Sequence, residues 1–126
     1  MQEVLDRHLI FGILSAMTRW SVQTLNEAVN AEIDALPQEM RARLARVASL
    51  IEEFGPFKVG MPHVRSLGDK LWEIRLSGRD GIARCVYVIA TAQQVVIVHA
   101  FVKKTQKTPS AAIATALKRA KEAGLT

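Results

Sequence analysis

Hydrophobic and polar positions in the first third of the chain follow two different periods. From Trp20 to Thr24 polar and apolar residues alternate, which predicts a first strand. Asn26 is a typical helix N-cap, and the pattern after it predicts a helix that runs to Leu36. Pro37 ends this helix and opens the next one.

The second predicted helix carries one apolar stripe. Its apolar residues recur at every third or fourth position, as on the buried side of an amphipathic helix, and they are Met40, Leu44, Val47, Ile51 and Phe54. Arg41, Arg43 and Arg46 lie off the stripe, so we expect them on a solvated face. Gly55 and Pro56 stop the helix.

The following region, which contains Gly60, Pro62 and Gly68, is expected to be a loop. After it the pattern becomes strand-like. Leu71–Leu76 and Ile82–Ala90 flank the turn sequence SGRDG, which predicts a hairpin, and the apolar run Val95–Val102 is typical of a buried central strand.

A last helix is predicted from Pro109 to about Ala123, with Thr108 as its N-cap. Its inward side chains are expected to be Ile113, Leu117 and Ala120. The element order predicts an α+β fold: an antiparallel sheet of about four to five strands, with two N-terminal helices packed on one face and a C-terminal helix.

Composition narrows the functional classes. The 126 residues fit one domain, and 49% hydrophobic residues can form a core without metal or disulfide support. Only 6% of the residues are aromatic, which argues against a surface that stacks several bases. Cys85 is the only cysteine, and no Cys/His spacing resembles a zinc site, so a metalloenzyme is not expected.

Charge is distributed unevenly between the two halves. Residues 1–57 carry five basic and eight acidic side chains, whereas residues 58–126 carry twelve basic and four acidic ones. A small domain with one strongly basic half favours a polyanionic partner, most often a nucleic acid. A basic surface that serves only solubility is the alternative.

Strand alternation collects the candidate residues on one face. If the helices cover one side of the sheet, the other side carries Glu73, Arg75, Arg84 and either His99 or Lys103. An arginine in such a strand is unfavourable unless it faces water or an anion. For Arg84, a structural salt bridge to Glu73 or Asp80 is the alternative to a functional role. Three converging cations favour a phosphate-binding surface.

Other candidates have structural alternatives. His99 lies among valines, where a histidine is more often a hydrogen-bonded core residue than an acid or base. Tyr87 and Cys85 share the strand face opposite Arg84, so we expect both in the core. The lysine-rich segment 103–107 follows a central strand, where functional groups are common, although it is also consistent with a solvated linker.

Three motifs resemble a known superfamily. L-W-E-I-R, G-I-x-R-x-x-Y and H-x-F-x-K-K-T-Q-K-T-P occur here in the order and spacing of RelE/ParE-superfamily toxins, and most closely of the HigB-like, phage-derived branch. The resemblance runs from Trp20 to the C-terminus and implies a RelE-like fold. Residues 1–16 fall outside it, so we expect an N-terminal extension followed by a single domain over residues 17–126.

The resemblance implies the toxin component of a type II toxin–antitoxin system. RelE-like relatives enter the ribosomal A site and cut mRNA with the RNA 2′-OH as nucleophile. The expected activity is therefore a metal-independent endoribonuclease (mRNA interferase) that inhibits translation and needs no cofactor. The expected partners are the ribosome, mRNA and a cognate antitoxin, a helix-turn-helix DNA-binding protein. The expected location is the cytoplasm, with no membrane contact.

By motif position, the resemblance implies a catalytic set. Arg84 would stabilise the phosphate, and Arg75 would contact it or move a proton. Lys103 and Lys104 would stabilise the transition-state charge or contact ribosomal RNA. The candidate acids and bases are Glu73, His99 and Tyr87. The candidate RNA-binding residues are Arg65, Lys70, Arg79 and Lys107.

Two departures from the superfamily keep other functions open. Some relatives have a catalytic tyrosine or histidine near the C-terminus, but no aromatic residue follows Phe101 here and His99 is the last histidine. The alternatives are a ParE-like poison of DNA gyrase and a catalytically inactive RNA- or protein-binding module of the same fold.

Overall fold

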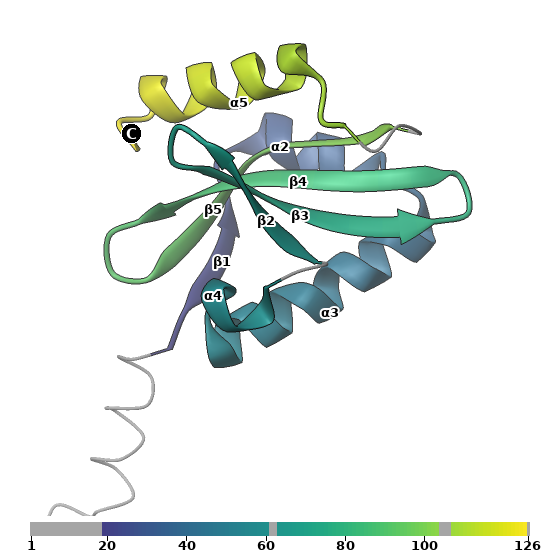
Figure 1. The fold of residues 1–126 in the computed structure, drawn as a ribbon, viewed down its shortest axis with the longest axis horizontal. Helices are drawn as coiled ribbons and strands as arrows, with labels where there is room; N and C mark the ends of the chain where they lie inside the picture. Colours follow the sequence, from purple (N-terminus) through teal and green to yellow (C-terminus); the bar gives the residue numbers. More distant parts are fainter. Residues whose placement is uncertain (1–18, 61–62, 104–106, 126) are drawn as a thin grey trace, which may run out of the picture.

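The computed structural model describes residues 19–60, 63–103 and 107–125, which form one five-stranded sheet with helices on both faces (Figure 1). The elements in chain order are β1 (Ser21–Thr24), α2 (Glu27–Asp34), α3 (Gln38–Phe54), α4 (Pro56–Val59), β2 (Val64–Gly68), β3 (Leu71–Gly78), β4 (Gly81–Ala90), β5 (Gln94–Lys103) and α5 (Ser110–Glu122). The expected extension over residues 1–16 lies outside the described residues.

The strand order is β1-β5-β4-β3-β2. β2, β3, β4 and β5 form an antiparallel series of neighbours along the chain, while β1 pairs parallel with β5 at the far edge. The predicted α+β class is confirmed. The predicted hairpin is also present, with Gly78 paired to Gly81 across a tight turn.

The two N-terminal helices follow the sequence signals closely. Asn26 caps α2, since its side chain accepts a hydrogen bond from the Val29 amide at 3.1 Å. The α3 stripe is buried except for Phe54, which is 51% exposed. The helix ends at this residue because Gly55 has a φ of 85° and lies so close to Trp20 that a Cβ would come within 2.8 Å of the indole nitrogen.

Each face of the sheet has its own hydrophobic core. Side chains of α2 and α3 pack with the inward residues of β3, β4 and β5 on one face. On the other face α5 packs over β4 and β5, as Figure 1 shows. The helix approaches the sheet through small side chains, so its buried residues are Ala112, Ala116 and Ala120, whereas Ile113 and Leu117 are only partly buried.

Two elements were not predicted. The region after Gly55 was expected to be a loop, but it contains α4 and the edge strand β2. α4 places Phe57 edge-on against Trp20 and Trp72, with ring centroids 6.0 and 5.8 Å away. β2 is half exposed and lacks the apolar alternation that would have indicated a strand. Among the described helices, none is long and apolar enough to cross a membrane.

The N-cap of α2 gives a stability prediction. Replacing Asn26 with Ala leaves the Val29 amide without its acceptor and should lower the free energy of unfolding by about 1 kcal/mol. Urea denaturation measures the change. Asn26→Ser, which keeps an acceptor, should remain within a few tenths of a kcal/mol of the wild type, and an equal loss in both variants would contradict the capping role.

Candidate functional site

The sheet face that carries α5 also gathers most of the predicted site residues. Strand register pairs Arg65 with Glu73, Arg75 with Arg84, and Arg84 with Phe101. Because side chains alternate along a strand, all five residues lie on the same face. We call Arg65, Glu73, Arg75 and Arg84, together with Thr108 from the chain that enters α5, the sheet-face cluster.

Glu73 is the wholly buried centre of this cluster. Arg75 Nε lies 3.1 Å from Oε1 in an ion pair, and the Thr108 hydroxyl donates a hydrogen bond to Oε2 at 2.6 Å. Both carboxylate oxygens are therefore held. Thr108 was expected to cap α5, but the N-cap is Pro109 without a side-chain hydrogen bond, and the Thr108 hydroxyl serves Glu73 instead.

Arg84 does not face water, because the structure buries it completely, and it lies on the same face as the Glu73 carboxylate, one of its two expected structural partners. Burial is the main reason that the pKa of Arg84 is lowered, and the positive charge of Arg75 adds to it. The Glu73 carboxylate opposes this shift, whereas Arg65 enlarges it. A guanidinium stays charged at neutral pH, so these surroundings favour any further negative charge placed on the face.

The surface of the cluster is formed by other cations. The Arg75 side chain is 13% exposed, and Arg65 is exposed on the edge strand β2. Lys103 pairs with Ile82, which puts it on the same face at the end of β5, and Lys107 is exposed beside Thr108. Lys104 lies outside the described residues.

Two predicted RNA-binding residues lie apart from each other. Lys70 is in the turn between β2 and β3, whereas Arg79 is in the turn between β3 and β4. These turns are at opposite ends of β3. The two side chains therefore cannot both belong to one compact site at the cluster.

Two of the three candidate acids and bases, Tyr87 and His99, do not belong to the sheet-face cluster. Tyr87 points into the core under α2 and α3, where it is wholly buried and burial raises its pKa. It does not face the cluster. His99 lies on the cluster face, but its Nδ1 is 3.0 Å from Glu32 Oε1. This contact fits the alternative that His99 is a hydrogen-bonded structural residue.

Glu32 connects α2, β5 and α5. It accepts hydrogen bonds from the Ala100 amide at 3.1 Å and from Arg119 at 2.9 Å, and Arg119 also donates to the Val98 carbonyl. β1 pairs with β5 only as far as Ile97, so these contacts satisfy the strand edge beyond that point. His99 is thus part of an edge-capping network.

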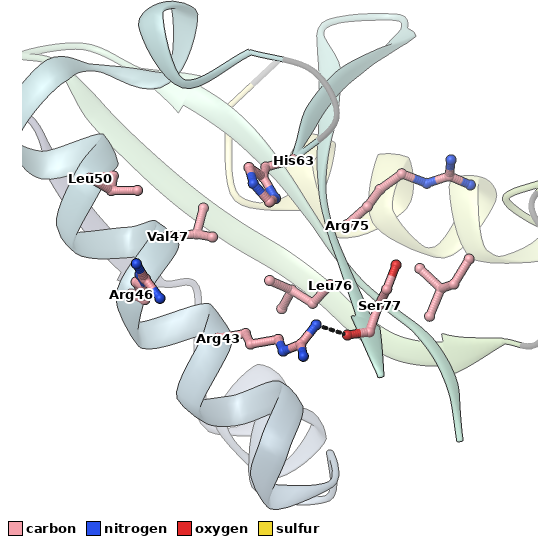
Figure 2. A pocket seen from close by; sticks show the side chains of 9 residues that line it. Arg43, Arg46, Val47, Leu50, His63, Arg75, Leu76 and Ser77 are labelled. Carbon is pink, nitrogen blue, oxygen red and sulfur yellow. Dashed lines mark hydrogen bonds between the residues drawn. The ribbon is translucent and has the colours of Figure 1, made fainter. Parts of the chain in front are cut away.

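A pocket of about 600 Å³ lies beside the cluster, between α3 and the end of β3 (Figure 2). It is lined by Arg43, Arg46, Val47, Leu50, His63, Arg75, Leu76, Ser77 and Ile82. Arg43 and Arg46 were expected on a solvated face; both are exposed, but they also line this pocket. Among the described residues, no group of three or more His, Cys, Asp or Glu side chains could hold a metal ion.

The Glu32 network predicts a pH dependence of stability. Burial raises the pKa of Glu32, but hydrogen bonds from Arg119, His99 and the Ala100 amide outweigh it, so the pKa lies below its ordinary value of 4.5. A carboxyl with a depressed folded-state pKa stabilises the fold above its unfolded-state pKa, and this contribution disappears as the pH falls through the folded-state pKa.

Glu32→Gln should therefore be less stable than the wild type at neutral pH, and the difference should shrink as the pH falls below 4.5. Urea midpoints measured from neutral pH to about pH 3 test this. Glu53→Gln, on the exposed side of α3, is the matched control. Its urea midpoint should change with pH in the same way as that of the wild type. A Glu32→Gln deficit that does not change with pH would contradict the prediction.

Comparisons with known proteins agree with this architecture. Residues 31–121 match the family described as Phage derived protein Gp49-like (DUF891). A solved structure of E. coli toxin RelE, a double arginine-to-alanine mutant in the free state, is similar with a TM-score of 0.58 and 18% sequence identity, over 80% of this chain and 97% of that chain. No curated protein matches the chain.

The RelE likeness shows the fold, and the family match covers most of the described residues. Both agree with the resemblance to the RelE/ParE superfamily and its phage-derived branch, which is confirmed. The chain belongs to the Phage derived protein Gp49-like family and has the RelE fold.

Proposed function

We propose that the protein is the toxin of a type II toxin–antitoxin pair and that it cleaves mRNA on the ribosome in the cytoplasm, without a metal ion. The family and the RelE fold support the toxin assignment. The endoribonuclease activity rests on one observation, which is the gathering of three arginines around a single buried carboxylate on one sheet face.

Cleavage through the 2′-OH requires positive charge around the phosphate. The attack forms the O2′–P bond and breaks the P–O5′ bond, giving a 2′,3′-cyclic phosphate. The 2′-hydroxyl loses its proton and the leaving 5′-oxygen gains one, and negative charge grows on the phosphate oxygens in the transition state. Fixed cations aimed at that charge lower the barrier. Arg75 is the partly exposed arginine of the cluster and contacts the phosphate in this proposal, while Lys103 approaches from the end of β5.

The two buried charged residues, Glu73 and Arg84, support Arg75 in different ways. Both oxygens of Glu73 are occupied by Arg75 and Thr108, so Glu73 positions the guanidinium and is not available as a base. Arg84 contributes positive potential from below the surface. An antitoxin that covers this face would neutralise the toxin by excluding RNA.

Mapping of 5′ ends in cellular transcripts after brief induction tests the activity. We expect new cuts inside translated regions that disappear when translation is blocked. Lys103→Gln and Arg75→Gln should reduce cutting, the latter by roughly 10²-fold as for the loss of one charge-stabilising group. Arg41→Gln removes an exposed arginine from α3, away from the cluster, and should cut like the wild type.

Folding must be measured for Arg75→Gln, because this change leaves the buried Glu73 without its ion-pair partner. Lys103 is exposed, so its substitution keeps the test valid if Arg75→Gln unfolds. Intact transcripts with an induced DNA-damage response would replace the proposal with gyrase poisoning. Absence of both effects would leave a binding module.

A basic face also predicts a salt-dependent affinity. Binding of a single-stranded oligonucleotide that lacks 2′-hydroxyls, and so cannot be cleaved, should weaken linearly on a log–log plot against salt concentration. Arg65→Gln should make the slope shallower by about 0.7, the value for one phosphate contact on a single strand. An unchanged slope would show that Arg65 does not contact the nucleic acid. A wild-type affinity that does not change with salt concentration would contradict the proposed basic binding surface.

A further inference from the structure

The pocket beside the cluster exists because two strands differ in length. β2 pairs with β3 only up to Ile74, and the last contact is the Arg75 amide with the His63 carbonyl at 2.8 Å. Beyond that point none of the described strands covers the edge of β3. Arg43 crosses from α3 and donates a hydrogen bond to the Ser77 carbonyl, which closes one end of the space (Figure 2).

One part of the lining is cationic. Arg43 and Arg46 come from α3 and Arg75 from β3, while His63, from the chain before β2, adds a ring that can form hydrogen bonds. The lining includes no acidic residue. Glu39 lies 3.9 Å from Arg43 Nη2, and both side chains are about half exposed. Such an exposed pair is weak. The pocket is therefore complementary to an anion.

The rest of the lining is apolar. Val47 and Leu50 face the space from α3, and Leu76 and Ile82 from the sheet. Leu50 is 37% exposed, so its side chain is accessible to a ligand in the pocket. An apolar wall beside a cationic one fits a ligand that has both a flat ring and a negative charge, and the volume of about 600 Å³ lies within the range of ligand pockets.

We propose that this pocket binds one nucleotide of a single-stranded RNA, with the phosphate at Arg46 and His63 and the base against Leu50 and Val47. Arg75 favours RNA over an acidic peptide as the occupant. It belongs to both sites, since it lines the pocket while its guanidinium points away from α3 (Figure 2) and pairs with Glu73 in the sheet-face cluster.

A single RNA strand, whose phosphates are regularly spaced, can thus continue from the sheet-face cluster around the edge of β3 into the pocket. The choice of RNA as ligand rests on the proposed function. The pocket would hold a nucleotide next to the one that reacts, so it is a binding subsite whose occupancy does not depend on cleavage.

Titration of the full chain with nucleotides, followed by NMR, tests the proposal without a ribosome. Adenosine 5′-monophosphate should shift the His63 ring resonances and the amides of Val47 and Leu50 in a saturable way. Inorganic phosphate carries only the anionic group and adenosine only the base and sugar, so each should bind more weakly. Arg46→Gln should weaken the nucleotide by about tenfold, the loss expected for one charge-assisted hydrogen bond.

Two further variants separate the parts of the site. Leu50→Ala should weaken the nucleotide and leave the affinity for inorganic phosphate unchanged, because only the apolar wall is altered. Arg41→Gln has the same charge change as Arg46→Gln on the same helix, but it lies outside the pocket lining and should bind like the wild type.

Several results would overturn the proposal. If the nucleotide shifted none of the resonances of the pocket residues, the proposed binding site would be rejected. Phosphate that binds as tightly as the nucleotide, with no effect of Leu50→Ala, would reduce it to a general anion site. An acidic peptide that binds more tightly than a short oligoribonucleotide would assign the pocket to a protein partner.

The outcome is separable from the nuclease test. Nucleotide binding without transcript cutting would keep the pocket and reject the nuclease. Transcript cutting by a chain whose pocket does not bind nucleotide would reject the pocket alone.

Discussion

The ion pair between Glu73 and Arg75 is the contact on which the arrangement of the basic face depends. A wholly buried carboxylate is tolerated only when its charge is matched, and here Arg75 and the Thr108 hydroxyl occupy its two oxygens. The same carboxylate offsets part of the lowering of the pKa of Arg84, which comes from burial and from the charges of Arg75 and Arg65. It also joins β3 to the chain that leads into α5. Glu73 therefore holds both the charges and the covering helix in place.

Local rules predicted the elements and the face on which the candidate residues lie. Alternation along a strand depends only on neighbouring residues, so it predicts correctly that Glu73, Arg75 and Arg84 share one face of the sheet. The helix stripe and the Asn26 cap are local in the same sense. The β2 strand was missed because half-exposed edge strands carry little apolar alternation.

Contacts between distant parts of the chain could not be predicted in this way. Thr108 lies 35 positions from Glu73, and Arg119 lies 87 positions from Glu32, so nothing in either local sequence indicates the pairing. The complete burial of Arg84 and the separation of Lys70 from Arg79 have the same origin. They depend on how the strands are aligned and on which face α5 covers, and only the tertiary structure supplies that information.

The parallel pairing of β1 with β5 has a consequence for the order of folding. Strands β2 to β5 are neighbours in both sequence and space, so their turns can close early and at low entropic cost. β1 begins at Ser21 but pairs with a segment that starts at Gln94, across most of the chain. We expect its docking to be a late step that completes the sheet after the antiparallel series has formed. On a translating ribosome, β1 would emerge before the other described strands and yet be among the last to find its partner.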